Sequence, residues 1–351
     1  MATDTLEQTL ARYTHEGSLY ERLPDRAVRC VACGHRCLIR EGKRGVCLVR
    51  FNEGGVLKVP HGYVGVLQCD PIEKKPFFHI LPGTDALSFG MLGCDFHCSY
   101  CQNFITSQAL RDPIAGVPPQ ITTPEQLVQL AEKHHASTVA STYNEPLITS
   151  EWAVEVFTVA RARGFKTAYI SNGNGTEEVL QYIRPWLDGY KIDLKSYNPQ
   201  HYRAELGGQL DTVLWTIRRV HELGLWLEIV TLVIPGFNDS DEELRQIAEF
   251  LVGISPDIPW HVTAFHKDYK MTDPANTSPE TLIRAAQIGI AAGLRYVYAG
   301  NLPGLVGTFE HTLCPSCRTA VIERRGYTIL ANRLVNGACP QCRTAIPGRW
   351  N

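Results

Sequence analysis

Short apolar runs alternate with amphipathic stretches through the central part of the chain. Six runs have the length and the β-branched or aromatic content of strands, and a seventh is similar; they occupy residues 86–92, 137–143, 166–171, 189–195, 226–234 and 260–266, with 295–300 as the seventh. The stretches between them repeat apolar residues at helical spacing. Strands that alternate with helices in this way are typical of repeated βα units around a parallel sheet.

Helix starts can be read in three of the intervening stretches. Thr123 is an N-cap residue followed by Pro124 at the first helical position and Gln126 at the third. Ser240 and Ser278 open the same kind of segment. Six or seven such units predict an α/β fold, a full or partial (β/α) barrel, with a doubly wound sheet as the alternative.

Polar residues stand at three predicted strand ends, where apolar ones would suffice. They are Asn144 and Glu145, Ser171 and Asn172, and Asp193 and Lys195. In the last strand, alternation puts Lys191, Asp193 and Lys195 on one face. Because chemistry in βα barrels collects at the C-terminal ends of the strands, the recurrence of these pairs favours a ligand site, with ordinary caps or salt bridges as the alternative.

Length and composition narrow the class of protein. At 351 residues and 44% hydrophobic content, the chain predicts two or three globular domains. No apolar stretch has the character of a signal peptide or a membrane span, so we expect a cytoplasmic protein without a membrane partner. Its twelve cysteines then indicate metal or redox chemistry, because the cytosol keeps thiols reduced.

Eleven of the twelve cysteines fall into three clusters. These are Cys30, Cys33, Cys37 and Cys47; Cys94, Cys98 and Cys101; and Cys314, Cys317, Cys339 and Cys342. The outer two lie in basic flanks: residues 21–50 carry eight Lys or Arg against three Asp or Glu, and residues 311–351 carry six Arg against one Glu. These flanks fit an acidic partner or RNA, and solvated surface charge is the simpler interpretation.

The middle cluster has the spacing C-x3-C-x2-C and lacks a nearby fourth cysteine. Structural zinc sites and ordinary iron–sulfur clusters are normally closed by four protein ligands. Three thiolates around a 4Fe-4S cluster leave one iron with an open position that can bind a substrate or cofactor. The alternative is a zinc site completed by a distant residue, such as His97 or an outer cysteine.

On a loop after the first predicted barrel strand, GCDFHCSYCQN resembles the cysteine motif of the radical S-adenosylmethionine (SAM) superfamily. The stretches DPIEKKPFFHILPG, TYNEP, SNGNG, KIDLK, TLVIPGFNDS, PWHVTAFHKDYKM and YVYAGN extend the resemblance to the activating enzymes of glycyl-radical proteins. More specifically, the chain resembles the radical SAM family of the AmmeMemoRadiSam system, which accompanies Memo-like and AMMECR-like proteins. The resemblance implies a 4Fe-4S cluster whose open iron binds SAM, one-electron cleavage of the carbon–sulfur bond, and hydrogen abstraction by a 5′-deoxyadenosyl radical.

The resemblance also implies roles for individual residues. Cys94, Cys98 and Cys101 would hold the cluster, and Tyr100 would pack near adenine. The SAM-binding residues would be Asn144 and Glu145, which replace the usual Gly-Gly-Glu at the amino group, Asn172 near the ribose, Asp193 and Lys195 in an Asp-Leu-Lys triplet with Lys195 at the carboxylate, and His266 in the same neighbourhood. Ile170 stands where activating enzymes have an acid, so we do not expect their monovalent cation.

The outer clusters have the spacings of closed metal sites. Cys314, Cys317, Cys339 and Cys342 form two C-x2-C knuckles around a segment, 320–330, that predicts a hairpin turning at Gly326, which is a zinc-ribbon pattern. Its simplest role is structural, with the metal stabilising a short C-terminal module, and docking of a protein or RNA is the alternative. For Cys30, Cys33, Cys37 and Cys47 we favour structural zinc, with an auxiliary iron–sulfur cluster as the alternative.

Three parts are therefore predicted: residues 1–70 with a four-cysteine metal module, 71–308 as a radical SAM barrel, and 309–351 as a zinc-ribbon-like module. The leading hypothesis is a radical SAM oxidoreductase, similar to pyruvate formate-lyase activating enzyme, that abstracts hydrogen from a protein or other large substrate. It would need an electron donor such as flavodoxin or ferredoxin. The alternatives are radical modification of a small molecule or RNA, and a non-enzymatic zinc-binding scaffold.

Overall fold

An eight-stranded sheet forms the centre of the computed structural model, which describes residues 4–351. Seven strands lie side by side in chain order and run parallel: β9 (Asp85–Gly90), β11 (Thr138–Ser141), β12 (Lys166–Ser171), β13 (Gly189–Asp193), β14 (Trp226–Val233), β15 (Trp260–Ala264) and β16 (Val297–Gly300). The edge strand β8 (Val66–Pro71) pairs antiparallel with β9. Among the described strands β8 and β16 are the edges, so the sheet is a partial barrel. A doubly wound sheet would require a reversal of strand order, which is absent from this sheet.

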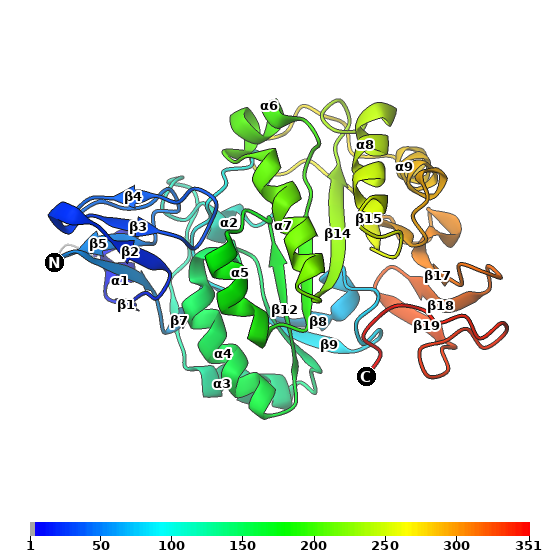
Figure 1. Ribbon diagram of the computed structural model, residues 1–351, viewed down its shortest axis with the longest axis horizontal. Helices are drawn as coiled ribbons and strands as arrows, with labels where there is room; N and C mark the ends of the chain where they lie inside the picture. The colour runs from blue at the N-terminus through cyan, green and yellow to red at the C-terminus, as the bar shows by residue number, and fades with distance from the viewer. Residues whose placement is uncertain (1–3) are drawn as a thin grey trace.

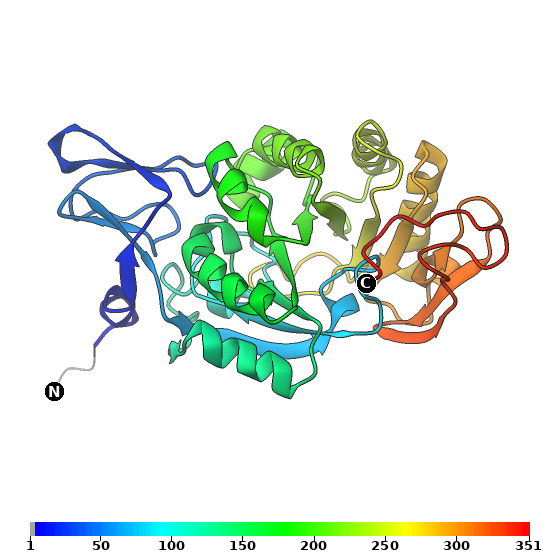
Figure 2. The same cartoon turned by 60° about the horizontal axis from the view of Figure 1, so that its bottom comes forward.

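Helices connect the parallel strands and pack on the outside of the curved sheet (Figure 1, Figure 2). The main ones are α3 (Pro124–Lys133), α4 (Ser150–Ala162), α5 (Glu177–Ile183), α7 (Leu210–Glu222), α8 (Asp241–Val252) and α9 (Pro279–Ala292), with the short α2 (Phe104–Ser107) and α6 (Pro199–His201) between strands. The predicted caps are confirmed: the side chains of Thr123, Ser240 and Ser278 each accept a hydrogen bond from the backbone N–H three residues on.

The N-terminal residues form two small sheets at one end of the molecule, drawn in blue in Figure 1. After α1 (Leu6–Ala11), one sheet consists of β1 (Thr14–Glu16), β6 (Val56–Pro60) and β5 (Phe51–Glu53), and the other of β2 (Tyr20–Arg22), β3 (Val28–Cys30) and β4 (Leu38–Ile39). A further pair, β7 (Tyr63–Val64) and β10 (Gln120–Ile121), leads into the barrel. A buried ion pair between Arg50 and Glu151 of α4 joins the segment to the barrel.

The C-terminal residues form a three-stranded sheet at the opposite end, drawn in orange and red in Figure 1. Its strands are β17 (Thr312–Leu313), β18 (Ala320–Arg325) and β19 (Thr328–Asn332). The predicted hairpin is confirmed, and Gly326 supplies the positive φ of 59° at its turn. Arg324 is buried against the barrel, where it donates to the carbonyl of Phe78 at 2.8 Å.

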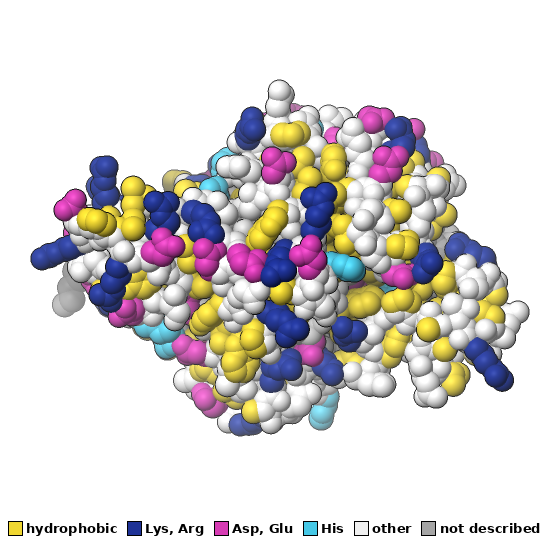
Figure 3. Space-filling view, in the orientation of Figure 1, with side chains coloured by type: hydrophobic (Ala, Val, Ile, Leu, Met, Phe, Trp, Pro, Cys, Tyr) yellow, Lys and Arg dark blue, Asp and Glu magenta, His cyan; other side chains and the backbone are white. Residues whose placement is uncertain are grey.

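The surface charge is mixed on the face shown in Figure 3, where acidic side chains lie between the lysines and arginines. Two arginines of the basic flanks, Arg50 and Arg324, are buried rather than displayed. The flanks are therefore less positive at their surface than their composition indicates. No helix in residues 4–351 combines the length and the apolar character that a membrane crossing needs.

Candidate active site

The three cysteines of the middle cluster lie on the loop between β9 and α2, at the C-terminal edge of the parallel sheet. Gly90 allows β9 to end close to its neighbour, because a Cβ at this position would stand 2.4 Å from the carbonyl oxygen of Thr142. In the loop, the backbone N–H of Phe96 donates to the sulfur of Cys94 at 3.4 Å.

The spacing of these thiols does not fit a single zinc ion. In the chain as described, from residue 4 to 351, the sulfur atoms of Cys94, Cys98 and Cys101 do not all lie within 4.8 Å of one another. Thiolates on a single tetrahedral zinc stand about 3.8 Å apart, because each Zn–S bond is about 2.3 Å long. In a 4Fe-4S cluster each thiolate binds a different iron, so the ligands stand farther apart. The donor set therefore fits a 4Fe-4S cluster with one iron left open.

Two adjoining cavities lie beside the loop. The smaller, of about 90 Å³, is lined by the three cysteines together with Asn144, Glu145, Asn172, Asp193 and Lys195. The larger, of about 350 Å³, shares Cys98, Cys101, Asp193 and Lys195 with it and extends past Tyr100. The strand ends that the polar pattern singled out thus meet at the cysteine loop.

Glu145 follows β11 and is buried, with both carboxylate oxygens engaged by the protein. One oxygen accepts from Leu147 N at 3.0 Å and Ser171 Oγ at 2.7 Å, and the other accepts from Asn172 N at 2.7 Å. Burial and the neighbouring Asp95 carboxylate raise the pKa of Glu145 to about 8. Glu145 therefore ties the end of β11 to the end of β12, where Asn172 stands.

Asp95, between the first two cysteines, is a site residue that the sequence reasoning missed. Its carboxylate is buried and accepts from Asn172 Nδ2 at 2.7 Å and from Asn174 Nδ2 at 2.8 Å. The amide of Asn172 is thus held by the cysteine loop. The repeated Asn in SNGNG was the available signal, because two amides after one strand need an acceptor from another element.

Three ionic residues of β13 and its end face the cavities, as the alternation predicted. Asp193 binds the ammonium groups of both Lys191 and Lys195, the latter at 3.2 Å. Burial alone would lower the pKa of Lys195, but the Asp193 carboxylate and the Cys98 thiol raise it well above its usual value. Lys195 is thus a fixed cation beside the cysteines, and it suits a carboxylate ligand.

The remaining predicted residues lie nearby in different settings. Tyr100 is buried, lines the larger cavity and packs edge-on against Phe237, with ring centroids 5.9 Å apart. Asn144 is held inside the protein, where its Oδ1 accepts from Met91 N at 3.0 Å. His266 is exposed and lines neither cavity, but its Nε2 lies 3.1 Å from Nε2 of Gln102, next to Cys101.

The mouth of the larger cavity is built from elements outside the parallel strands. Lys74 and Lys75 reach it from the segment after β8, and Tyr327 reaches it from the C-terminal hairpin. The Tyr327 hydroxyl donates to Oδ1 of Asn301 at 3.2 Å. The C-terminal module therefore supplies part of the cavity wall, which its sequence pattern did not indicate.

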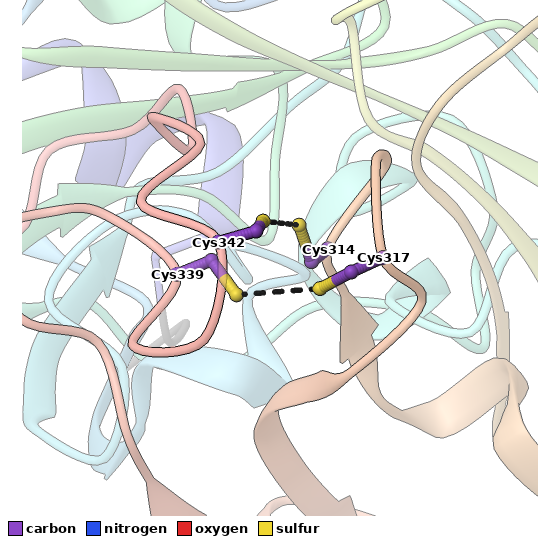
Figure 4. Close-up of side chains that lie close together, drawn as sticks. All are labelled: Cys314, Cys317, Cys339 and Cys342. Carbon is purple, nitrogen blue, oxygen red and sulfur yellow. Dashed lines mark hydrogen bonds between the residues drawn. The ribbon is translucent and has the colours of Figure 1, made fainter.

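The four C-terminal cysteines converge on one point, as the close-up in Figure 4 shows. Their sulfur atoms lie within 4.8 Å of one another, with Cys314 to Cys342 at 3.5 Å and Cys317 to Cys339 at 3.6 Å. A hydrogen bond between the side chains of Cys317 and Thr319 lowers the pKa of this thiol to about 6, which favours the thiolate that a metal requires. The distances fit one tetrahedral ion.

The first cluster of four cysteines lies in and after β3 and has wider spacing. No three of its sulfur atoms lie within 4.8 Å of one another. Besides the four C-terminal cysteines, the group within residues 4–351 whose ligand atoms do meet this limit is His15, His61 and Glu155. That half-buried group lies where the N-terminal segment contacts α4, and His61 Nε2 is 3.0 Å from Glu155.

Comparisons with known proteins agree with this arrangement. The family model described as the Radical SAM superfamily matches residues 90–251. The uncharacterized protein MJ0808 of Methanocaldococcus jannaschii is 39% identical over 311 residues, which cover 88% of this chain and 91% of that protein. The pyruvate formate-lyase-activating enzyme of Clostridium pasteurianum is 24% identical over 211 residues, covering 55% of this chain and 84% of that enzyme.

A solved structure gives the same fold. Streptococcus suis SuiB bound to S-adenosylmethionine superposes with a TM-score of 0.50 at 13% identity, over 69% of this chain and 55% of SuiB.

A further sequence relative is the isethionate sulfite-lyase activating enzyme of Desulfovibrio desulfuricans, which is 29% identical over 125 residues, covering 35% of this chain and 40% of that enzyme.

Proposed function

Because this chain belongs to the radical SAM superfamily, we propose that it cleaves SAM reductively at a 4Fe-4S cluster and abstracts hydrogen from a protein or other large substrate. The observation that carries the proposal is the cavity lined jointly by the three cysteines, Asp193 and Lys195. When bound, the cluster and SAM supply one-electron cleavage of the sulfonium and a 5′-deoxyadenosyl radical.

The side chains of the chain itself bind and orient these groups. Cys94, Cys98 and Cys101 would hold the 4Fe-4S cluster and would leave one iron free to bind SAM. Lys195 holds the SAM carboxylate, and Asp193 keeps its ammonium group beside the cysteines. A cation fixed by a buried carboxylate orients a ligand with little loss of side-chain entropy.

The polar residues at the other strand ends shape the SAM cavity. Glu145 fixes the end of β12 through Ser171 and Asn172, which sets the position of Asn172 near the ribose. Asn144 borders the site of the amino group, Tyr100 packs near adenine, and His266 approaches from the rim through Gln102. Burial of the cavity keeps water and stray hydrogen donors away.

A large substrate is favoured by the open side of the barrel and by the relatives named as activating enzymes. The substrate would enter past Lys74, Lys75 and Tyr327 at the mouth of the larger cavity. One electron must come from outside the chain, from a donor such as flavodoxin or ferredoxin. Low-potential donors and reduced thiols both favour the cytoplasm.

The C-terminal module and the division into parts complete the proposal. The four C-terminal cysteines bind one zinc ion, which staples a small module whose own core is short of apolar residues. We retain the division into residues 1–70, 71–308 and 309–351, with the barrel as the catalytic part.

SAM binding to the open iron is tested by spectroscopy before turnover. The anaerobically reconstituted protein is reduced with dithionite, and its electron paramagnetic resonance (EPR) spectrum is recorded with and without SAM. A changed cluster signal supports the proposal. An unchanged signal, with SAM present at saturation, contradicts it.

The size of the substrate is tested by isotope transfer. Wild-type protein is turned over with SAM and size-fractionated extract from cells of the source organism grown in deuterated medium, and deuterium in 5′-deoxyadenosine is measured. Label from the protease-sensitive, high-mass fraction supports a protein substrate. Label only from the low-mass fraction, or label removed by ribonuclease, favours the small-molecule or RNA alternative.

A further inference from the structure

The four N-terminal cysteines lie together in the interior of their module. Cys30 ends β3, Cys33 and Cys37 lie between β3 and β4, and Cys47 lies between β4 and β5. Three of them, Cys30, Cys33 and Cys47, are only 5–7% exposed. All four are free thiols, and Cys37 Sγ accepts a backbone hydrogen bond from Val46 at 3.4 Å. Bonds from backbone N–H groups to sulfur are common around metal-bound thiolates and tune the site.

Whether these thiols gather around one point separates the two metals that the sequence left open. The C-terminal cysteines of the same molecule gather within 4.8 Å, with pairs at 3.5 and 3.6 Å, as a single ion requires. Of the N-terminal four, all in the described part of the chain, no three gather so closely. In this respect they match Cys94, Cys98 and Cys101, the triad of the radical SAM motif.

We propose that Cys30, Cys33, Cys37 and Cys47 bind a second iron–sulfur cluster rather than a zinc ion. Each thiolate would then bind its own iron, which accounts for sulfur atoms that do not gather within 4.8 Å of one another. With four protein ligands the cluster is closed, so it binds no SAM. This inference concerns a site separate from the SAM cavity and stands whether or not SAM is cleaved.

The second site lies directly against the loop that carries the first. Gly93, the residue before Cys94, lies directly against the N-terminal module. A Cβ atom added at this glycine would stand only 3.0 Å from the carbonyl oxygen of Cys47. Arg111 joins the two loops by donating to the carbonyl oxygens of Val46 at 2.9 Å and of Cys94 at 3.1 Å. The two clusters are therefore neighbours, close enough for magnetic interaction between their unpaired electrons.

The ring of His35 adds a third connection between the modules. Its Nε2 lies 3.1 Å from the carbonyl oxygen of Asp95, between the first two cysteines of the radical SAM motif. His35 stands between Cys33 and Cys37, so the two ligand loops touch at their centres. The N-terminal module is thus fixed relative to the barrel loop on the side of its cysteines.

Metal content after anaerobic reconstitution tests the proposal on the intact chain. Wild-type protein should hold about eight irons and about one zinc, the zinc in the C-terminal module. Mössbauer spectroscopy with and without SAM should show that SAM changes the signal of only one of the two clusters. About four irons and two zinc ions per chain would overturn the proposal.

Two variants locate the iron. The triple variant C94A/C98A/C101A removes the radical SAM ligands and should keep about four irons, whereas adding Cys33→Ala and Cys47→Ala should remove them and leave about one zinc. Circular dichroism and the retained zinc check that each variant is folded. A triple variant without iron but with a second zinc would contradict the proposal.

Magnetic coupling provides a test that needs no damaged N-terminal site. Reduced wild-type protein should give an EPR spectrum broadened or split by interaction between two paramagnetic clusters. The triple variant should give one uncoupled signal. Two wild-type signals that simply add, without interaction, would overturn the placement of the second cluster beside the first.

Discussion

The buried ion pair between Arg50 and Glu151 joins the N-terminal segment to the barrel. Arg50 donates to Glu151 through two nitrogens, at 2.6 and 3.0 Å, and the two side chains are 1% and 3% exposed. The same carboxylate accepts from the backbone N–H groups of Ser18 at 3.2 Å and Leu19 at 3.3 Å. One side chain of α4 therefore holds two separate stretches of the N-terminal segment.

Replacing Glu151 by Gln keeps the volume and removes the charge. Arg50 then stays buried without a counter-ion, and the amide of Gln must point an N–H toward groups that are themselves donors. Removing one partner of a buried pair costs about 3–5 kcal/mol of unfolding free energy, because the remaining charge is uncompensated. We expect Glu151→Gln to lower the unfolding free energy by about this amount, a large part of a typical domain's stability.

The assay is urea denaturation followed by tryptophan fluorescence, with equal metal loading in all samples. The chain has six tryptophans, and one of them, Trp152, is buried on α4 next to Glu151. The matched control is Glu132→Gln, because Glu132 also pairs with Arg163 through two bonds, at 2.9 and 3.0 Å, but the side chains are 43% and 38% exposed. This exposed pair should contribute at most about 1 kcal/mol.

The reasoning is refuted if Glu151→Gln loses no more stability than Glu132→Gln. A double variant gives a second check on the cause. Replacing both partners with apolar residues, as in R50M/E151L, removes the unpaired charge and should recover much of the loss. If the double variant does not regain stability, the loss comes instead from the hydrogen bonds of Glu151 with the backbone of Ser18 and Leu19.

Three further outcomes follow from the structure. Lys195→Met should weaken SAM binding at least tenfold in calorimetric titration, since a hydrogen bond to a charged group contributes about 1.5–3 kcal/mol, whereas Lys74→Met at the cavity rim should leave SAM affinity unchanged; equal affinities of Lys195→Met and wild type would contradict the assignment. Cys314→Ser should lose about one zinc per chain and lower the thermal midpoint while the iron content stays the same, and retention of zinc would contradict the ribbon site. Burial lowers the pKa of His79 to about 4 from its ordinary 6.5, so the unfolded chain binds this proton more tightly, and the unfolding free energy decreases as the pH is lowered between those values. Between pH 7 and pH 5 wild type should lose about 2 kcal/mol more unfolding free energy than His79→Gln in urea denaturation, and equal losses would refute the His79 contribution.

The central sheet could be predicted because its signals are local. Six strands of the parallel series fall within the predicted apolar runs, and β9 starts one residue before its run. The caps at Thr123, Ser240 and Ser278 directly precede the helices they start. Alternation along β13 also placed Asp193 and Lys195 on the cavity side. These features depend on the periodicity of apolar residues and on the spacing of capping residues, and both can be read from a single sequence.

Features made by distant residues could not be predicted in the same way. The strand β8 was missed because VLQCDP is half polar and pairs antiparallel at an edge. Asp95 resembles any loop aspartate until the fold brings Asn172 and Asn174 to it, and Tyr327 reaches the cavity only through the packing of the C-terminal hairpin. Each of these contacts joins segments far apart in the chain, and no local pattern encodes it.

Reductive cleavage of SAM tests the central claim most directly. Anaerobically reconstituted protein is incubated with SAM and dithionite, and 5′-deoxyadenosine is quantified beside the Cys98→Ala variant, whose C-terminal zinc serves as the control for folding. The account predicts 5′-deoxyadenosine from wild type, dependent on iron and reductant, and none from Cys98→Ala. Wild-type protein that binds zinc throughout, takes up no iron and forms no 5′-deoxyadenosine would contradict it and favour a zinc-binding scaffold.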